Sequence, residues 1–337
     1  MAEKQLGSAS FALARPVTVL GWGNIVGKKE GEGPLGGLFD QISQDSYFGE
    51  QTWEKAESAM QRQAVSAALE RSGQPASALT ALFGGDLMNQ CIATSYAARS
   101  LNVPLFGLYG ACSTMAESMA LAALLIDGGF ADFAGAVASS HFCTAERQYR
   151  TPLEYGGQRT PNAQWTATAC GAVVLAREGS GPYISHVTVG KVVDRAIKDP
   201  NNMGAAMAPA AYDTISTHLS DTGRSAGFYD LIVTGDLGKL GSRVLKELFR
   251  QDGMELNNHN DCGLMLFDLQ RQDVHCGGSG CGCSAAVLTA LLLEQVKQGK
   301  LHNILFCATG ALHSPTALGQ GESIPGICHA VAITDTP

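Results

Sequence analysis

Short hydrophobic runs alternate with segments of helical periodicity along the whole chain, a pattern typical of proteins in which strands and helices take turns. In the first half, the runs at 79–87 and 104–109 have the length and composition of buried strands, and the segments at 94–101 and 115–127 that follow them have the spacing of helices. The second of these helices is predicted to end at a glycine pair, after which residues 134–138 form another strand.

The second half repeats this order of elements. Its predicted segments are a strand at 229–237, a helix at 242–252, a glycine-rich turn at 277–284, a helix at 285–298 and a strand at 303–308. Asp86 and Asp236 occupy equivalent positions, because both first runs end in Gly-Asp-Leu. His141 and His313 are also equivalent, because each follows a small-residue turn after the last strand.

This duplication predicts an α/β fold with two thiolase-like halves, residues 1–178 and 179–337, joined by strands at 166–176 and 183–190. Each half makes a mostly parallel sheet that needs helices on both faces. Two such halves can share one central layer of helices, which gives a five-layer αβαβα arrangement. The run 116–126 is apolar on nearly all sides, as a helix of that central layer must be.

Composition excludes several classes of function. The chain has 337 residues, 45% of them hydrophobic, and a net charge of −8, which argues against disorder and against nucleic-acid binding. The N-terminus lacks the apolar core of a secretory signal, and no apolar run is long enough for a membrane-spanning helix. Ten cysteines in such a chain are expected to be reduced thiols, so we expect a soluble cytoplasmic protein.

Cys112 is the strongest candidate for chemistry. It lies in a Gly-Ala-Cys-Ser-Thr turn between a predicted strand and the apolar helix, where the helix dipole and free backbone N–H groups favour a thiolate. It could act as a nucleophile, contact a ligand, or fill space as a small hydrophobic residue.

The repeat and this turn resemble the thiolase superfamily, in which such a turn carries the nucleophile. The resemblance is incomplete: the Gly-His-Pro segment of thiolases is absent. Related ketoacyl synthases place a histidine after the strand that here ends at Asp236, and a histidine or asparagine in the turn that here runs from 280 to 284. Neither position offers an imidazole, so condensing chemistry is in doubt unless His141 or His313 replaces it.

Within this superfamily, long irregular strings resemble the stage V sporulation protein AD family of spore-forming bacteria. These strings are at 28–36, 85–90, 110–114, 145–150, 154–158, 203–210, 259–263 and 322–325. The resemblance implies a non-catalytic protein that binds dipicolinic acid (pyridine-2,6-dicarboxylate), as free acid or calcium chelate, during its uptake into the developing spore. It also implies partnership with the SpoVA membrane channel proteins, a peripheral location at the inner membrane of the forespore, and a homodimer, the common state of thiolases.

A site for a planar dianion needs cationic groups that can bond both oxygens of a carboxylate, further hydrogen-bond donors, and a flat surface on which the ring can stack. Arg147, Arg150 and Tyr155 are candidates from one loop-like stretch that also holds Tyr149 and Arg159, although the arginines could equally form a structural ion-pair network. The carboxylates of Asp86 and Asp236 suit calcium, or each caps the helix or turn that follows it. Asp261 is a third acidic residue, in an irregular segment, that is expected to line the same pocket. The full set of predicted ligand-binding residues is Cys112, Asp86, Asn89, His141, Arg147, Arg150, Tyr155, Asp236, Asp261 and His313.

Two other functions remain open at this point. Cys112 could serve an acyltransferase or condensing enzyme that acts on acyl thioesters, or the chain could be an assembly scaffold. No cofactor or resident metal is expected, because the cysteines at 262, 276, 281 and 283 lack the spacing of a zinc site and the glycine-rich turn lacks the ending of a phosphate loop.

Overall fold

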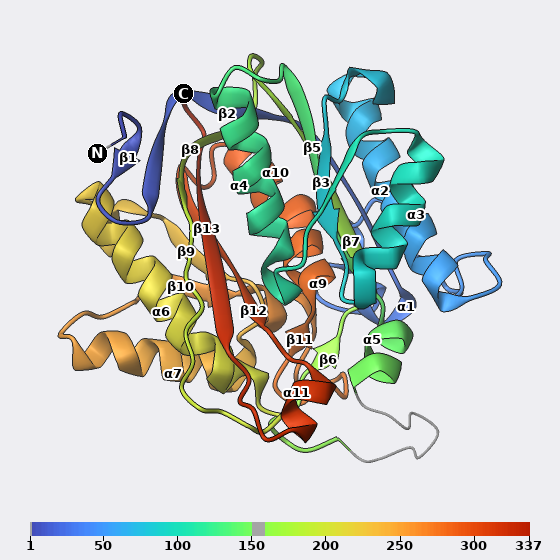
Figure 1. The fold of residues 1–337 in the computed structure, drawn as a ribbon, viewed down its shortest axis with the longest axis vertical. Helices are drawn as coiled ribbons and strands as arrows, with labels where there is room; N and C mark the ends of the chain where they lie inside the picture. The colour runs from blue at the N-terminus through green and yellow to red at the C-terminus, as the bar shows by residue number, and fades with distance from the viewer. Residues whose placement is uncertain (1, 150–158) are drawn as a thin grey trace.

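The computed structural model describes residues 2–149 and 159–337, and strands and helices alternate through both halves (Figure 1). The first half contributes β2 (Ser10–Val26), α2 (Trp53–Ser72), β3 (Leu82–Gly85), α3 (Ile92–Leu101), β4 (Leu105–Gly107), α4 (Thr114–Asp127), β5 (Phe133–Ser140), α5 (Phe142–Tyr149) and β7 (Ala169–Ala176). The second contributes β8 (Tyr183–Thr188), α6 (Met203–Thr222), β9 (Leu231–Thr234), α7 (Gly238–Gln251), β10 (His259–Asp261), α9 (Cys281–Val287), β12 (Asn303–Ala311) and β13 (Gly326–Thr334). Shorter elements are β1 (Gln5–Leu6), α1 (Lys28–Gly31), β6 (Trp165–Thr166), α8 (Cys262–Leu266), β11 (Gly278–Ser279), α10 (Leu293–Lys297) and α11 (Pro315–Gly319).

The strands of both halves join in one sheet with the order β10-β9-β12-β13-β8-β2-β7-β5-β3-β4. The order is symmetric about its centre, where β2 and β8 pair antiparallel, so each strand of one half has its counterpart in the other. The outer strands of each half are parallel, namely β3 with β4 and β5, and β9 with β10 and β12. The inner strands β7 and β13 are antiparallel to their neighbours. The sheet is therefore mixed, with its parallel part in the outer strands of each half.

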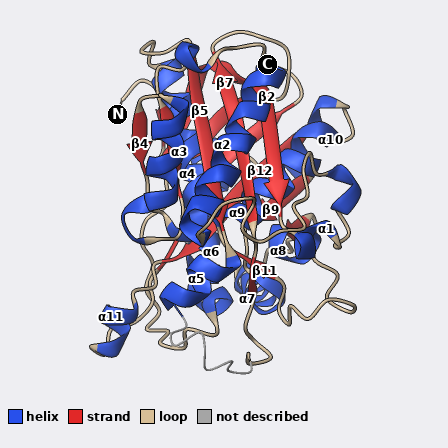
Figure 2. Cartoon of the chain, turned by 90° about the vertical axis from the view of Figure 1, so that its right-hand side faces the viewer, coloured by secondary structure: helices blue, strands red, loops and turns tan. Residues whose placement is uncertain are grey.

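Helices cover the strands in layers, which Figure 2 shows from the side. α4 and α9 contact strands of both halves and form the central layer. The side chains of α4 are buried around most of its circumference, including Met115, Met119 and Ile126, as the apolar run predicts. α2 and α3 cover the outer face of the first half, and α6 covers that of the second with α7 packed on it. The predicted five-layer order is thus present.

The two longest helices, α2 and α6, are equivalent members of the repeat. Thr52 caps the start of α2 and Asn202 that of α6, each accepting a hydrogen bond from a backbone N–H at 3.3 Å. Gly73 and Gly223 end them in the left-handed conformation, with φ of 68° and 66°, which glycine adopts without a side-chain clash. In the second half, the predicted helix at 285–298 is interrupted by a π-helical turn at Leu288–Leu292.

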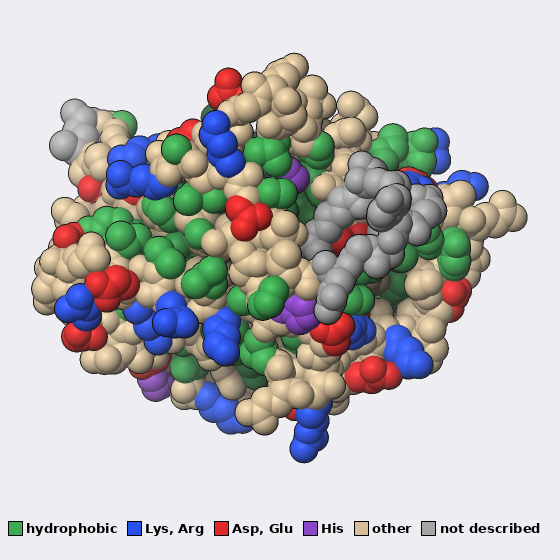
Figure 3. Space-filling model, turned by 90° about the horizontal axis from the view of Figure 1, so that it is seen from below, with side chains coloured by type: hydrophobic (Ala, Val, Ile, Leu, Met, Phe, Trp, Pro, Cys, Tyr) green, Lys and Arg blue, Asp and Glu red, His purple; other side chains and the backbone are tan. Residues whose placement is uncertain are grey.

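Seen from below the view of Figure 1, the surface carries charged residues of both signs in a mixed arrangement (Figure 3). In the described part of the chain, no helix combines the length and hydropathy that crossing a membrane requires.

Candidate functional site

Cys112 lies in a tight turn, Ala111–Ser113, that leads from β4 directly into α4. Ala111 has a φ of 49°, a conformation that is strained for a residue with a side chain and that turns the chain sharply into the helix. The Ser113 hydroxyl donates to the carbonyl of Gly110 at 2.7 Å, which tightens the turn. β12 passes directly behind the turn. The approach is so close that a Cβ added to Gly310 would lie 2.3 Å from the Gly110 carbonyl oxygen. The turn therefore holds Cys112 in one position.

The thiol of Cys112 interacts with the carboxyl group of Asp236, which follows β9. Asp236 is fully buried and also accepts from the Gly280 backbone N–H at 2.9 Å and from the Thr309 hydroxyl at 2.9 Å. Burial raises the pKa of Asp236 to about 7. Burial, and then the charge of Asp236, raise the pKa of the Cys112 thiol well above its ordinary value. This environment opposes formation of the thiolate that a nucleophile requires.

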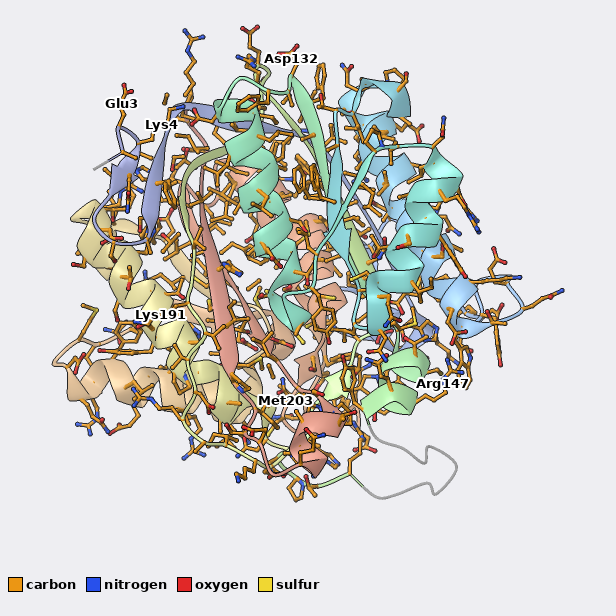
Figure 4. The ribbon with its side chains drawn as sticks, viewed as in Figure 1. Glu3, Lys4, Asp132, Arg147, Lys191 and Met203 are labelled. Carbon is orange, nitrogen blue, oxygen red and sulfur yellow. The ribbon has the colours of Figure 1, made fainter. Side chains whose placement is uncertain are left out.

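A pocket opens beside Cys112. The free space of this pocket, counted out to its open mouth, is about 530 Å³. The enclosed space that is available to water is only about 40 Å³. The lining residues come from both halves of the molecule: Leu87, Ala111, Cys112, Ala145, Glu146, Tyr149, Gln164, Thr166, Met203, Ser279, Ala311 and His313. In Figure 4, Met203 lies at the lower centre, below α4. The described part of this lining contains no Lys or Arg side chain.

Two aromatic rings line the pocket. Tyr149 and His313 lie with their ring centroids 5.3 Å apart. The Tyr149 hydroxyl donates to the backbone carbonyl of Leu87 at 2.7 Å and also contacts the hydroxyl of Tyr109 at 2.5 Å. Because these contacts fix the hydroxyl end of Tyr149, its ring face can serve as a flat surface for an aromatic ligand.

The pocket also contains a carboxyl group that the sequence analysis did not single out. Glu146, on α5, is 5% exposed and accepts from the Thr166 hydroxyl at 3.4 Å. Gln164 lies beside it and donates through Nε2 to the backbone carbonyls of Asp236 and Gly278, both at 2.7 Å. Glu146 and Asp236 thus place two acidic groups near Cys112.

Of the ten predicted ligand-binding residues, Cys112 and His313 line the pocket and Asp236 lies directly behind Cys112. Arg150 and Tyr155 lie outside the described residues. The other five lie outside the pocket lining.

Asp86 and Asp261 make helix-capping contacts, and neither belongs to the pocket lining. Asp86 is buried and accepts from the backbone N–H and the hydroxyl of Thr94, in the first turn of α3, at 2.9 and 2.7 Å. Asp261 accepts from the backbone N–H groups of Leu237 and Gly238 at 2.8 and 3.0 Å, where α7 begins. Asn89, next to α3, is exposed and lies outside the pocket lining.

His141 and Arg147 also have structural contacts. His141 faces the Ser46 carbonyl through Nε2 at 2.7 Å and accepts from the Cys143 backbone N–H through Nδ1 at 3.1 Å, so both ring nitrogens hold the local backbone. Arg147 pairs with Glu54 and lies over the Trp53 ring at 5.4 Å, pointing to the outside of α5 (Figure 4). The ion-pair alternative for Arg147 is therefore the one that the structure has.

Three of the pocket residues that sequence reasoning missed come from one short ribbon and the residue before it. β6 pairs in parallel with β11, and Gln164, Thr166 and Ser279 from this ribbon reach the pocket. A two-residue strand carries no hydrophobic pattern that could reveal it. All ten cysteines are free thiols, and the described residues contain no group of three or more His, Cys, Asp or Glu side chains that could hold a metal ion.

Comparison with solved structures places the fold in the thiolase-like class. The chain is similar to 3-oxoacyl-[acyl-carrier-protein] synthase III from Aquifex aeolicus, with 13% identity, a TM-score of 0.58 and coverage of 94% of this chain and 99% of that one. It is also similar to a variant of OleA from Xanthomonas campestris, with 14% identity, a TM-score of 0.62 and coverage of 95% and 97%. These likenesses confirm the predicted fold class.

The sequence defines the family more narrowly. The family model of stage V sporulation protein AD (SpoVAD) matches residues 7–334. Stage V sporulation protein AD of Bacillus subtilis is 44% identical over 329 residues, which cover 97% of each chain. The chain therefore belongs to the SpoVAD family of sporulation proteins.

Proposed function

We propose that this sporulation protein binds dipicolinic acid in the Cys112 pocket, without catalysis, and serves its uptake into the developing spore. The observation that carries the proposal is the pairing of Cys112 with Asp236. The turn of a thiolase-like enzyme is retained, but a buried carboxyl group occupies the place where related condensing enzymes have an imidazole. A thiol held in its neutral form is a poor nucleophile, which favours non-covalent binding beside it over covalent catalysis.

The chemistry of the lining favours the calcium chelate over the free dianion. Glu146 lines the pocket, and its carboxylate would repel the two carboxylates of a free dianion. Calcium removes the net charge of the ligand and accepts further oxygen ligands, which a carboxylate such as Glu146 can supply.

Binding requires the pocket to widen. A pyridine ring exceeds the roughly 40 Å³ that water can fill, which is enough for about three water molecules. Separation of the Tyr149 and His313 rings would expose two flat faces, between which a planar ring fits. Met203, at the start of α6, is a flexible side chain that can adjust to the same ligand.

The proposal includes partners and a location. A protein that binds dipicolinic acid for its uptake into the spore needs a channel that carries the acid across the membrane. The family resemblance implies that the SpoVA membrane proteins form this channel. We propose that the chain docks peripherally on them at the inner membrane of the forespore.

Calorimetry tests the proposal directly. Purified protein should bind dipicolinate at millimolar concentration or below, more tightly with calcium, and Cys112→Ala should weaken binding about tenfold while the protein stays folded. Cys143→Ala is the matched control, because Cys143 lies on α5 outside the pocket lining. Absence of binding with and without calcium would refute the proposal.

The alternative function, acyl transfer through Cys112, is favoured by the retained turn at the start of α4. Incubation with acyl-CoA and measurement of intact mass separates the two. An acyl adduct that is lost in Cys112→Ala would establish a nucleophile and displace the binding proposal.

A further inference from the structure

The ribbon formed by β6 and β11 has a second face, turned away from the Cys112 pocket. Successive side chains of a strand point to opposite sides, so Gln164 and Thr166 face the pocket and Trp165 faces away from it. Phe142 stacks on the Trp165 ring with centroids 4.0 Å apart and planes inclined by 16°. The indole is therefore held rigidly on this far side.

Two cations lie over this one ring. Lys29 Nζ is 3.8 Å and Arg159 Cζ is 4.4 Å from the ring centroid of Trp165. Two positive charges on one ring repel each other: burial and then the charge of Arg159 lower the pKa of Lys29, while the smaller effects of Asp273, Glu30 and Glu32 oppose that shift. Such an arrangement is stabilised when an anion is added to it.

One acidic residue already occupies the position of such an anion. The backbone carbonyl of Asp273 accepts from Arg159 at 2.8 Å and from Lys29 at 3.3 Å. Its carboxylate lies 3.5 Å from Arg159 and 2.9 Å from His275 Nε2, yet this side chain is 76% exposed. His275 also faces the Thr160 carbonyl through Nδ1 at 2.7 Å, so its ring is held between these two acceptors.

An open groove of about 520 Å³ is lined by Arg159, Thr160, Pro161 and His275. His275 has a φ of 51°, a conformation that strains a residue other than glycine and that turns its ring toward Asp273. Rigid aromatic support, converging cations and a groove together define a place for a carboxylate from outside the chain.

We propose that Lys29, Arg159 and His275, supported by Trp165, form a second, anion-binding site that takes a small dicarboxylate. The ligand displaces the exposed side chain of Asp273, which acts as an internal substitute. This site is separate from the Cys112 pocket, because the β6–β11 ribbon lies between them, and it does not depend on the function proposed for that pocket.

Malonate is a suitable probe, since it is a dicarboxylate without an aromatic ring. Nuclear magnetic resonance of protein with labelled tryptophan side chains, titrated at constant ionic strength, should give a saturable shift of the Trp165 indole signal at millimolar malonate, with Trp22 and Trp53 unaffected. The Trp165 signal is assigned by its loss in Trp165→Phe.

Variants separate this site from general ion effects. Lys29→Gln and Arg159→Gln should each weaken malonate binding about fivefold or more, whereas Lys28→Gln, which changes an exposed neighbour paired with Glu32, should not. Asp273→Asn should tighten binding about threefold, because the internal competitor is removed. Cys112→Ala should leave malonate binding unchanged, so this site can fail or hold whatever the result at the Cys112 pocket.

Three results would overturn the proposal. These are the absence of saturation up to about 50 mM malonate, an equal shift produced by chloride, and an Asp273→Asn variant that binds less tightly than the unchanged protein. The last result would make Asp273 part of a structural ion-pair network and leave no room for an external ligand.

Discussion

The thiol of Cys112 and the carboxyl group of Asp236 form a buried, interacting pair between the two halves of the molecule. One residue comes from the turn before α4 and the other from the end of β9, so the pair exists only when both halves are folded together. Burial and then the charge of Asp236 raise the pKa of Cys112, whereas the Cys112 side chain lowers the pKa of Asp236 against the larger, raising effect of burial. The pair therefore stays neutral under conditions in which an exposed aspartate would be ionised.

Asp236→Asn should make Cys112 more reactive. Replacing the carboxyl group with a neutral amide removes one of the causes that raise the thiol pKa, although burial, the larger cause, remains. Alkylation of Cys112 by iodoacetamide at pH 8 should become about tenfold faster, which corresponds to one pKa unit. Peptide mass spectrometry gives the rate at this residue, and the other cysteines provide the internal control. An unchanged rate would show that burial alone controls the thiol.

Most of the fold could be predicted from the hydrophobic pattern, because the repeat is visible wherever an element is uniformly apolar. β3, α4, β5, β7 and β12 fall in or close to the predicted ranges. α2 gave no such signal, because its buried face includes Glu57 and Gln61, which break the apolar spacing. Their burial is compensated by hydrogen bonds to Ser139 and Thr94, at 2.8 to 2.9 Å, that come from distant segments and cannot be read from sequence.

The site was predicted less completely than the fold. Cys112, His313 and Asp236 were accessible to sequence reasoning because each ends a recognisable strand or begins a helix. Asp86 and Asp261 have the same signal but cap helices, since a carboxylate at a strand end serves either role. Glu146 was missed because it follows no strand, and only the packing of α5 against the β6–β11 ribbon brings it to the pocket.

The stability of the protein should be highest near pH 6.5. Four fully buried carboxyl groups have raised pKa values, to about 6 for Asp261, about 7 for Glu30 and Asp236, and about 8 for Glu57. Their contribution is fully present below the unfolded pKa values of about 4 and is lost as the pH rises through the folded values. We expect the free energy of unfolding to fall by on the order of 1–3 kcal/mol between pH 6.5 and 8.

Below pH 6.5 the free energy of unfolding is expected to fall for a different reason. Buried histidines have lowered pKa values, about 3 for His218 and about 4 for His186, His259 and His329. Their contribution is present above the unfolded value of about 6.5 and is lost as the pH falls toward the folded values. Urea unfolding at pH 5, 6.5 and 8 tests both sides, and Glu57→Gln should flatten only the alkaline one. Stability that rises steadily up to pH 8 would contradict the assignment of raised carboxyl pKa values.

Gly310→Ala should damage the Cys112 turn. The new methyl group would lie 2.3 Å from the Gly110 carbonyl oxygen and 3.3 Å from the Cys112 backbone nitrogen, so the turn or β12 must move. We expect a loss of about 1–3 kcal/mol in unfolding free energy, together with weaker dipicolinate binding. Gly319→Ala, at a position with nothing within 4 Å, is the matched control and should change neither measurement. Equal effects of the two substitutions would contradict this account of the turn.

Glu146→Gln should distinguish the bound form of dipicolinate. If calcium is coordinated by this carboxylate, the substitution weakens binding of the calcium chelate about tenfold and leaves binding of the free acid unchanged or tighter. Calorimetric titrations with calcium and with a chelator measure the two forms separately. Equal weakening of both would mean that Glu146 acts through packing, and that calcium is not recognised at this position.

The homodimer expected from the family resemblance can be tested at the edge of the sheet. β4 is the last strand in the described order, and its backbone groups on the outer side are available for pairing with a second copy (Figure 2). Phe106 on this strand is 56% exposed, which is unusual for a ring of this size outside an interface. If the protein is a dimer through this edge, Phe106→Glu should give a monomer in light-scattering measurements, because two such charges would be buried face to face. Val192→Glu introduces the same charge at a site that is 55% exposed and should leave the dimer intact. A dimer that survives Phe106→Glu must use another surface, and a monomeric unchanged protein would remove the expectation altogether.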